Sequence, residues 1–383
     1  MMTHVHIRGP LLSISGYGVH SRQIARWAFA QDFHVTVEIL PWGNTPWYTD
    51  RNECNGLIDK IMEASRPLAS RPDYSFQIQL PHEWDNTIAR KNFGVTAVVE
   101  SDKCSEEWVK SCLQMHHIIV PSEFSKQCLV NSGLNAKRVT VIPESWMDDI
   151  GVSQQELELP FETDNNYLML GQMSGDWETD RKNTAQTIAL FCDVFEGRDD
   201  IGLIVKTNSG GNSSVDRAVS RNMLKSVLRQ VRKSQFPRVY FLHGYLKEKE
   251  VAALYQHHKV KGLISLTHGE GFGLPLLEAA ACGLPICATN WSAHTEFLNL
   301  GNWTKVDARI EPISSKKVDG TIWIEGAKWA YPKIEETKAA LETFVSNNDE
   351  LQKQASGLHE KILQKYSFTK IYYRYDKFFK RWK

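Results

Sequence analysis

The sequence has few features that would indicate a disulfide framework, a membrane span or a nucleic-acid partner. Its seven cysteines form no Cys-x-x-Cys pair and no zinc-finger spacing, so we expect reduced thiols and a cytoplasmic protein. No stretch approaches the roughly 18 apolar residues of a membrane-spanning helix, and the first residues lead into a predicted strand without a signal peptide. Lys and Arg number 45, as do Asp and Glu. The net charge is therefore zero, which predicts no nucleic-acid partner.

Short β-rich runs alternate with helical stretches along most of the chain, which predicts an α/β protein with parallel sheets. The predicted strands of the first half are 5–8, 35–40, 76–80, 97–100, 117–121 and 139–142. Those of the second half are 167–170, 203–206, 239–242, 262–266, 286–289 and 305–306. The polar stretch 148–166 lies between the two series and is the predicted linker. At 383 residues the chain is long enough for two domains, which we place at 1–155 and 156–366.

The segment from His268 to Glu278 is the most informative part of the chain. It reads His-Gly-Glu-Gly-Phe-Gly-Leu-Pro-Leu-Leu-Glu, follows a predicted strand and enters a helix with Pro275 in its first turn. Loop amides and the positive end of a helix favour an anion, usually phosphate. Glu270 and Glu278 would repel a phosphate at contact distance, so we expect them to accept hydrogen bonds from hydroxyls flanking it. A ligand with a central phosphate and hydroxyls on both sides is a nucleotide sugar.

The stretch Glu-Gly-Phe-Gly-Leu-Pro-Leu-Leu-Glu-Ala-Ala-Ala-Cys-Gly-Leu-Pro, which starts at Glu270, resembles the signature of retaining family-4 (group 1) glycosyltransferases. In that signature, seven residues separate two glutamates. The resemblance implies that Glu270 contacts hydroxyls of the donor sugar and that Glu278 holds the ribose hydroxyls. It also implies that sugar and phosphate bind the backbone of Gly271, Phe272, Gly273 and Leu274. The alternative is an ordinary strand-loop-helix unit whose glutamates face solvent.

The resemblance further implies the GT-B fold, in which two Rossmann-like domains enclose a cleft. After residue 334 the sequence predicts helices over 334–345, 349–364 and 368–383. In the related fold the last helix crosses back onto the N-terminal domain, so we assign 367–383 to that domain. The aromatic side chains of this helix suit that packing. Its basic residues also permit a peripheral contact with an anionic membrane.

Cations near the start of the second domain are candidates for neutralising a departing diphosphate. Lys182 matches a lysine of the family pattern, but Gln172 stands where the family usually has an arginine. Either Arg181 or Lys206 could take the place of that arginine. Asp-x-Asp, which holds a metal ion on the diphosphate in glycosyltransferases of the other major fold, is absent. We therefore expect no metal and no cofactor.

Two groups of the first domain are also candidates. Gly16, Tyr17 and Gly18 precede a predicted helix, and the family has a glycine loop here that approaches the donor phosphates. A plain turn is the alternative. His82 follows a predicted strand, and family members often have a histidine in this region beside the transferred sugar. A loop histidine without a catalytic role is the alternative for this residue.

The predicted activity is transfer of a hexose from a nucleoside-diphosphate sugar to an acceptor hydroxyl, with retention at the anomeric carbon, in glycan, polysaccharide or glycolipid synthesis. His243 and Gly244 are the predicted contacts of the nucleobase. The sequence specifies neither the base and sugar of the donor nor the acceptor, which could be a glycan, a lipid or a protein. A non-catalytic nucleotide-sugar-binding scaffold and a phosphorylase, epimerase or hydrolase of the same fold are the alternatives.

Overall fold

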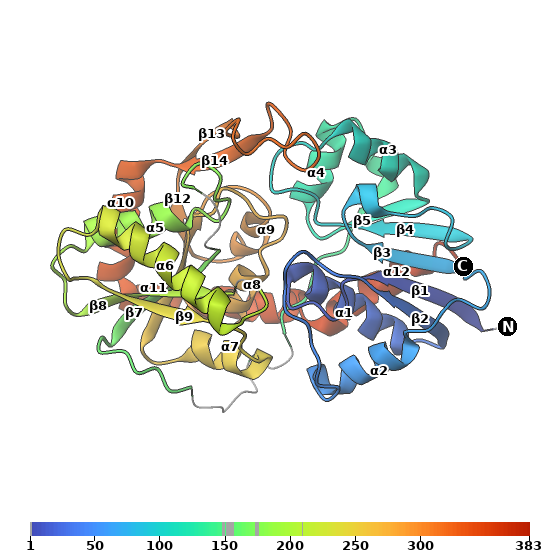
Figure 1. Ribbon diagram of the computed structural model, residues 1–383, viewed down its shortest axis with the longest axis horizontal. Helices are drawn as coiled ribbons and strands as arrows, with labels where there is room; N and C mark the ends of the chain where they lie inside the picture. The colour runs from blue at the N-terminus through green and yellow to red at the C-terminus, as the bar shows by residue number, and fades with distance from the viewer. Residues whose placement is uncertain (1, 148–149, 151–156, 173–175, 209) are drawn as a thin grey trace. The chain divides into compact units, whose positions relative to one another are not determined.

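The computed structural model describes residues 2–147, 150, 157–172, 176–208 and 210–383. The chain divides into two compact units, which are described separately (Figure 1). The first comprises Met1–Ser145, Asp319–Ala327 and Phe368–Lys383, and the second comprises Trp146–Val318 and Lys328–Ser367. The predicted boundary between residues 155 and 156 lies outside the described residues.

A parallel six-stranded sheet forms the centre of the first unit, in the order β2-β1-β3-β4-β5-β6. Its strands are β1 (Thr3–Gly9), β2 (Phe33–Ile39), β3 (Tyr74–Ile78), β4 (Lys91–Val95), β5 (His117–Val120) and β6 (Val139–Val141). The helices of this unit are α1 (Gly16–Phe29), α2 (Leu57–Ala64), α3 (Glu106–Gln114), α4 (Glu123–Asn131) and α12 (Phe368–Phe379). Alternating strands and helices with parallel pairing are what the hydrophobic pattern predicts.

The second unit contains another parallel six-stranded sheet, in the order β12-β11-β10-β7-β8-β9. Its strands are β7 (Asn165–Gly171), β8 (Ile201–Thr207), β9 (Arg238–His243), β10 (Val260–Ser265), β11 (Ile286–Thr289) and β12 (Thr304–Val306). Its helices are α5 (Thr184–Val194), α6 (Ser214–Val231), α7 (Glu248–Gln256), α8 (Leu274–Ala281), α9 (His294–Leu298), α10 (Ile334–Ser346) and α11 (Asn348–Lys365). The predicted α/β fold with two parallel sheets is confirmed.

The predicted strand at 97–100 is wrong, because β4 occupies this place in the sheet with residues Lys91–Val95. The backbone of the segment after β4 is not extended, since Val98 has a left-handed φ of 60°. Ala97 donates its N–H to the Tyr17 hydroxyl and accepts a bond from Ser125 at its carbonyl. Hydrogen bonds to side chains of α1 and α4 therefore replace the strand pairing that its apolar residues predicted.

A two-stranded antiparallel sheet of β13 (Ala308–Pro312) and β14 (Lys328–Pro332) was not predicted. Strand β14 of this sheet forms hydrogen bonds with the loop after β10. Ala330 in β14 donates its N–H to the His268 carbonyl and accepts a bond from His268 Nδ1 at 2.6 Å. The His268 ring also stacks on Trp329, with 5.0 Å between ring centroids. The hairpin thus fixes the start of the segment that carries the glutamate signature.

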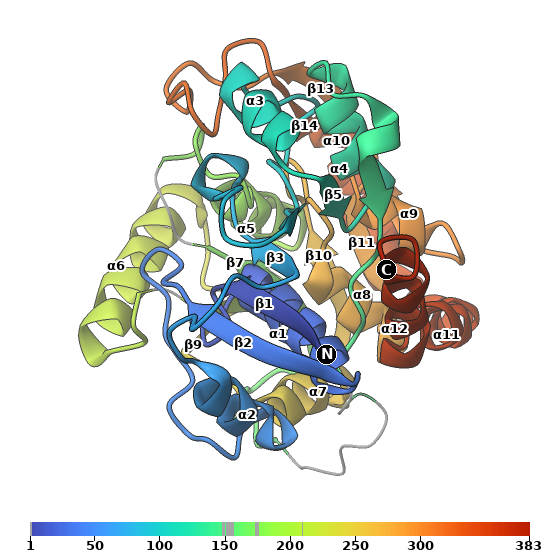
Figure 2. The same cartoon turned by 90° about the vertical axis from the view of Figure 1, so that its right-hand side faces the viewer.

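The return of the last helix to the first domain is confirmed. Trp27 of α1 is buried and contacts the rings of Tyr375 and Phe379 in α12. Its indole N–H donates to Asp376 Oδ1 at 2.9 Å. In Figure 2, α12 lies next to the marked C-terminus, to one side of strands β1 and β2. Aromatic packing at positions 375 and 379, one turn apart, explains why this segment forms a helix on the first unit.

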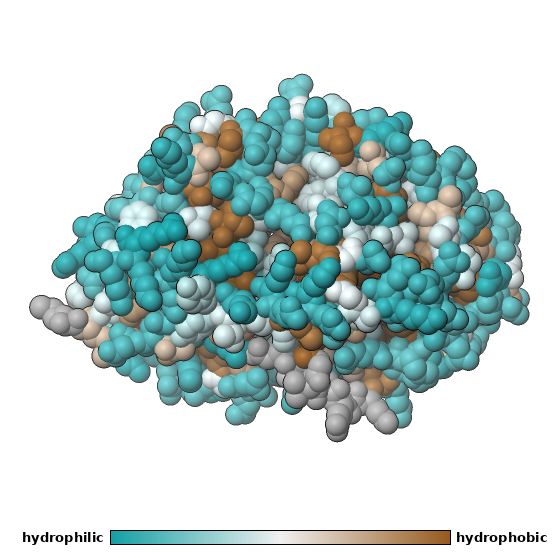
Figure 3. All heavy atoms as spheres, turned by 180° about the vertical axis from the view of Figure 1, so that it is seen from behind, coloured by the Kyte–Doolittle hydropathy of each residue, from teal (hydrophilic) through white to brown (hydrophobic). Residues whose placement is uncertain are grey.

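The surface is mostly polar on the face that Figure 3 displays, where hydrophobic side chains occur in small separate groups. Among the helices that the structure describes, none combines the length and the apolar character needed to cross a bilayer.

Candidate active site

The loop between β10 and α8 carries the glutamate signature at the carboxyl end of the second sheet, where open α/β sheets bind ligands. Gly273 is the N-cap of α8 and has a left-handed φ of 97°. A Cβ at this position would lie 3.0 Å from His294 Cβ, so glycine is required for both conformation and space. Pro275 lies in the first turn, as predicted, where the missing N–H costs no helical hydrogen bond.

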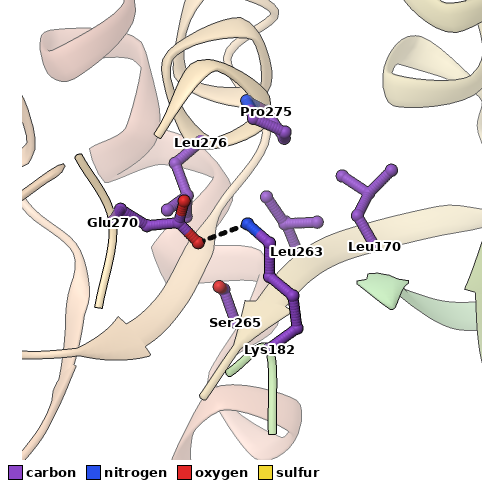
Figure 4. A pocket seen from close by; sticks show the side chains of 7 residues that line it. All are labelled: Leu170, Lys182, Leu263, Ser265, Glu270, Pro275 and Leu276. Atoms are coloured by element: carbon purple, nitrogen blue, oxygen red, sulfur yellow. Dashed lines mark hydrogen bonds and ion pairs between the residues drawn. The ribbon is translucent and has the colours of Figure 1, made fainter. Parts of the chain in front are cut away.

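A small pocket opens beside this loop. Glu270 and Lys182 point toward each other in the pocket, and Ser265 lies next to them (Figure 4). Its remaining lining is apolar: Leu170, Leu263, Pro275 and Leu276. The charged pair is therefore placed in an environment of low polarity, where an ion pair is stronger than in water.

Glu270 forms the centre of a charged cluster. Its carboxylate lies 2.5 Å from Lys182 Nζ and 3.7 Å from an Arg181 guanidinium nitrogen. Burial alone would raise the pKa of Glu270, but the Lys182 and Arg181 cations outweigh it and lower the pKa to about 2. The carboxylate is therefore ionised at neutral pH and available as a hydrogen-bond acceptor. The structure thus brings Glu270, Lys182 and Arg181 together.

The segment before α5 holds the two cations in place. Asp180 accepts bonds from the N–H groups of Lys182 at 3.1 Å and Thr184 at 2.6 Å. Asn183 adopts a left-handed φ of 54° and donates its side-chain amide to the Leu266 carbonyl at 3.0 Å. Gln172, which stands at the expected arginine position, donates its N–H to Thr184 Oγ1. Sequence reasoning assigned no role to Asp180 or Asn183, although short polar residues before a helix are a recognised capping signal.

Ser292 and His294 form a hydrogen-bonded chain behind Glu270 that sequence reasoning missed. The Glu270 N–H donates to Ser292 Oγ at 2.9 Å, and Ser292 Oγ lies 3.4 Å from His294 Nδ1. His294 Nε2 lies 2.7 Å from the Thr289 carbonyl, which can only accept, so Nε2 carries the proton. Nδ1 of the neutral ring is then an acceptor, and the Ser292 hydroxyl donates to it. Burial lowers the pKa of His294, which favours this neutral form.

Ser292 is also held in an unusual backbone conformation, with a φ of 76°. The next residue, Ala293, donates its N–H to the Glu270 carbonyl at 3.3 Å. Both backbone groups of Glu270 are therefore bonded to one short segment after β11. A non-glycine residue in the left-handed region is uncommon and is often found at functional sites. The only sequence signal was the position of this segment at the carboxyl end of a predicted strand.

Glu278 is buried on α8 and does not line the pocket that contains Glu270. Burial is the main factor that raises the pKa of Glu278 to about 8, and the nearby Glu248 carboxylate adds to it. A hydrogen bond from the buried Tyr255 of α7 acts in the opposite direction. Glu278 is therefore largely protonated at neutral pH. The two signature glutamates differ in charge, although their residue type is the same.

Lys206 and the predicted nucleobase contacts lie at the carboxyl ends of β8 and β9. The Lys206 ammonium is bonded to the Gly244 carbonyl, and burial lowers the pKa of Lys206 to about 8. Gly244 has a φ of 114° and open space around its Cα, so a ligand could approach its backbone closely. His243 precedes it at the end of β9. Of the two candidates for the missing arginine, Arg181 approaches Glu270, whereas Lys206 bonds to Gly244.

The predicted glycine loop of the first unit forms the first turn of α1. A Cβ on Gly18 would lie 2.0 Å from the Ser13 carbonyl oxygen, so the backbone leaves no room for a side chain. A Cβ on Gly16, in contrast, would have no neighbouring atom within 4 Å. The Tyr17 hydroxyl bonds to Thr96 Oγ1 at 2.9 Å, and its ring stacks on Trp42 with centroids 4.0 Å apart. Close packing thus accounts for Gly18, and Gly16 stays open to solvent.

His82 is exposed in a short helical turn (Pro81–Glu83) after β3. Its ring stacks against Trp108 of α3, with centroids 5.9 Å apart. His82 and the Gly16–Gly18 turn belong to the first unit, whereas the Glu270 cluster belongs to the second. Within the residues that the structure describes, no group of three His, Cys, Asp or Glu side chains could hold a metal ion.

Comparisons with known proteins agree with this geometry. The family model described as "Glycosyl transferases group 1" matches residues 209–306, which include both signature glutamates. A serotype-specific mannosyltransferase, WbdA of Escherichia coli, is 28% identical over 178 residues. That alignment covers 46% of this chain and 19% of WbdA, so the chain spans only about a fifth of the length of its curated relative.

Solved structures resemble the chain over nearly its full length. Sucrose-phosphate synthase from Thermosynechococcus elongatus superposes with a TM-score of 0.66 at 13% identity, covering 99% of this chain and 98% of that one. Anabaena HepE in complex with UDP and glucose gives 0.64 at 12% identity, covering 99% and 100%. A glycosyltransferase from Rickettsia africae gives 0.67 at 14% identity, covering 99% and 98%. The fold is therefore GT-B, and the resemblance of the signature segment to group 1 glycosyltransferases is confirmed.

Proposed function

We propose that the protein transfers a hexose from a nucleoside-diphosphate sugar to an acceptor hydroxyl, with retention of the anomeric configuration. The observation that carries this proposal is the buried cluster of Glu270, Lys182 and Arg181 beside the start of α8. It combines an ionised acceptor for sugar hydroxyls with two cations for a diphosphate. The group 1 match over the same segment supports it, as does the mannosyltransferase relative.

In this reaction the bond between the anomeric carbon and the diphosphate oxygen breaks. A new bond forms from the acceptor oxygen to the same face of that carbon, and the acceptor proton passes to an oxygen of the leaving diphosphate. Lys182 and Arg181 stabilise the charge that develops on the diphosphate. The mechanism requires no carboxylate nucleophile, no metal and no other cofactor, because the leaving group serves as the base.

The remaining candidates take supporting roles in this proposal. Glu278 hydrogen-bonds the ribose hydroxyls, and His243 and Gly244 contact the base. The backbone of residues 271–274 binds the sugar and the phosphates. Lys206 is the alternative to Arg181 as the second cation for the diphosphate. We rank it second because its ammonium is bonded to Gly244 rather than to the Glu270 cluster.

The first unit supplies the acceptor side of the reaction in this proposal. Gly16, Tyr17 and Gly18 approach the donor phosphates, and His82 lies beside the transferred sugar. The acceptor is a glycan, a lipid or a protein, and the product belongs to glycan, polysaccharide or glycolipid synthesis. We propose a cytoplasmic location, because all seven cysteines lie in the described part of the chain as thiols outside any disulfide.

The test is a donor-consumption assay with UDP-, GDP- and ADP-linked hexoses, alone and with a panel of glycan acceptors. Slow release of nucleoside diphosphate without acceptor, and faster release with one acceptor, is the expected result. NMR of the product should show the anomeric configuration of the donor. An inverted product contradicts retention. Binding of a donor without turnover on any acceptor supports the non-catalytic scaffold instead.

A further inference from the structure

The segment that leaves β2 in the first unit, drawn in blue in Figure 1, carries two tryptophans at the protein surface. Trp47 is 41% exposed, although a tryptophan is usually highly buried. Trp42 lies five residues earlier and is partly exposed. Exposure of apolar rings to water is unfavourable, so two such rings in one short segment are a candidate contact surface.

Both tryptophans lie beyond the carboxyl ends of strands in the first sheet. The segment after β2 pairs by its backbone with the segment after β1. The Pro46 carbonyl accepts a bond from the Ile14 N–H at 2.9 Å, and the Tyr48 N–H donates to the Leu12 carbonyl at 2.8 Å. Open α/β sheets bind their ligands at this edge, so the two tryptophans are placed where a substrate is expected.

The side chain of Trp47 lies beside a cluster of hydroxyl groups. The two backbone bonds hold Trp47 opposite Ser13 in an antiparallel bridge. Side chains directly opposite each other in such a bridge share one face. Ser13 Oγ lies 2.6 Å from Thr45 Oγ1 and 2.8 Å from Ser15 Oγ. An apolar ring and several polar groups are therefore available on the same face.

Trp42 is held by the first turn of α1. One face of its indole stacks on the Tyr17 ring, with centroids 4.0 Å apart and an interplanar angle of 19°. Tyr17 is fixed in turn by its bond to Thr96. The Trp42 carbonyl accepts a bond from Thr45 Oγ1 at 2.8 Å. The segment is therefore preorganised, which reduces the entropic cost of binding a ligand. We call Trp42 and Trp47 the aromatic platform.

We propose that the aromatic platform binds a pyranose ring of the acceptor and that the acceptor is a glycan, an assignment that rests on the proposed transferase function. A pyranose has a face of C–H groups, which packs on an indole, and a rim of hydroxyls, which requires polar partners. Asn44 is exposed between the two tryptophans, and its amide can both donate to and accept from such hydroxyls.

The composition of the segment favours a glycan over a lipid. The exposed Gly43 and Asn44 interrupt the apolar surface between the two tryptophans. A lipid tail gains free energy in proportion to the apolar area that it covers, so an interrupted surface suits it poorly. The single basic residue of the segment 40–53 is Arg51, which already pairs with Asp59 at 2.7 Å. The segment therefore offers little to the phosphate of a lipid.

The experiment is fluorine NMR of the full chain labelled with fluorotryptophan and titrated with trisaccharides of glucose, mannose and galactose. Loss of one signal in Trp42→Phe and of another in Trp47→Phe assigns the two resonances. At least one trisaccharide should shift both signals. Trp47→Ala should weaken its binding about tenfold, because the variant loses most of the apolar contact area. Trp47→Phe keeps an aromatic face and should retain most of the binding, and thermal melting of each variant checks its folding.

Trp177 of the second unit provides the matched control, because it is also 41% exposed. Trp177→Ala should leave trisaccharide binding unchanged. The proposal is overturned if no trisaccharide shifts the signals of the aromatic platform, or if Trp177→Ala weakens binding as much as Trp47→Ala. A shift produced by a short-chain alkyl phosphate instead of the trisaccharides would indicate a lipid acceptor and also overturns it.

Donor hydrolysis without acceptor, measured on the unmodified chain, separates this proposal from the proposed function. Hydrolysis of a donor together with absent trisaccharide binding refutes the glycan assignment while the transferase function stands. Trisaccharide binding without consumption of any donor refutes the transferase function and, with it, the role of the bound glycan as acceptor.

Discussion

Replacement of Lys182 by methionine tests whether the Glu270 cluster is built as the structure indicates. Lys182→Met keeps the length of the side chain but leaves the Glu270 carboxylate with Arg181 at 3.7 Å as its remaining cation. The difference between the ordinary pKa of 4.5 and the value of about 2 corresponds to about 3 kcal/mol of stabilisation of the charged form. Removal of the Lys182 ammonium should lower the free energy of unfolding by about 2 kcal/mol, which is most of this stabilisation, because a buried carboxylate becomes poorly paired.

The assay is thermal unfolding of the full chain, monitored by circular dichroism. A loss of about 2 kcal/mol in a unit of this size lowers the melting temperature by about 4–8 °C. The double variant Lys182→Met with Glu270→Gln should regain most of this loss, because no buried charge is left unpaired. It should nevertheless not regain donor turnover, since the diphosphate has lost a cation.

The ion pair between Lys316 and Glu178 provides the matched control. Its N–O distance is 2.9 Å, but both side chains are more than half exposed. Lys316→Met should leave the melting temperature almost unchanged, since solvent screens such pairs. The reasoning is refuted if Lys182→Met melts as the unmodified chain does, or if the double variant is as unstable as the single one.

The direction of the Glu270 pKa shift determines how the destabilisation caused by Lys182→Met depends on pH. The folded state lowers the pKa of Glu270, so its stabilisation is complete above pH 4.5 and is lost as the pH falls toward 2. The destabilisation caused by Lys182→Met should therefore be full at pH 7 and shrink as the pH falls below about 4.5. A constant difference across this range would assign the loss to packing instead of charge.

Three further predictions concern other parts of the molecule. The folded state raises the pKa of Glu278 from 4.5 to about 8, so its contribution to stability should decline as the pH rises through this range. Glu278→Gln should remove that decline and make the protein more stable at pH 8 by on the order of 4 kcal/mol, as measured by denaturant titration. If stability falls with pH equally in the variant and the unmodified chain, the burial of an ionisable Glu278 is contradicted. Ser292→Ala should leave the Glu270 N–H unpaired and cost about 1–3 kcal/mol, whereas a melting temperature equal to that of the unmodified chain contradicts the chain to His294. Gly18→Ala should lower the melting temperature strongly, because its Cβ would meet the Ser13 carbonyl, while Gly16→Ala should be tolerated; similar melting of both variants would refute the packing argument.

Most of the fold could be predicted from the sequence, because the strands of parallel sheets are short apolar runs with helices between them. The prediction of a strand at 97–100 failed because side chains distant in sequence bind the backbone there. Residues 97–100 are apolar enough for a strand, but Tyr17 and Ser125 bind the backbone of Ala97 instead. The β13–β14 pair escaped prediction although β13 alternates apolar and polar residues, because each strand has only five residues and ends in proline, which argues against a strand.

The candidate site was predictable only where the residues are contiguous. Residues 270–278 are one continuous loop-helix segment, so spacing alone places Glu270 in the loop before α8 and Glu278 one turn into that helix. The different charge states of Glu270 and Glu278 depend on surroundings that distant segments create: Lys182 and Arg181 outweigh burial at Glu270, whereas burial, together with Glu248, raises the pKa of Glu278. The hydrogen bonds that link Glu270 to Ser292 and His294 depend on how the polypeptide folds after β11. No local sequence pattern encodes that fold.

The most direct test of the central claim is a thermal-shift titration with UDP-, GDP- and ADP-linked sugars, because a ligand of the folded state raises stability by mass action. One class of donor should raise the melting temperature of the unmodified chain. The same donor should give a much smaller rise with Glu278→Ala, which removes the hydrogen bonds proposed for the ribose hydroxyls. An equal rise in the two proteins would contradict the assignment of residues 270–278 as the donor site.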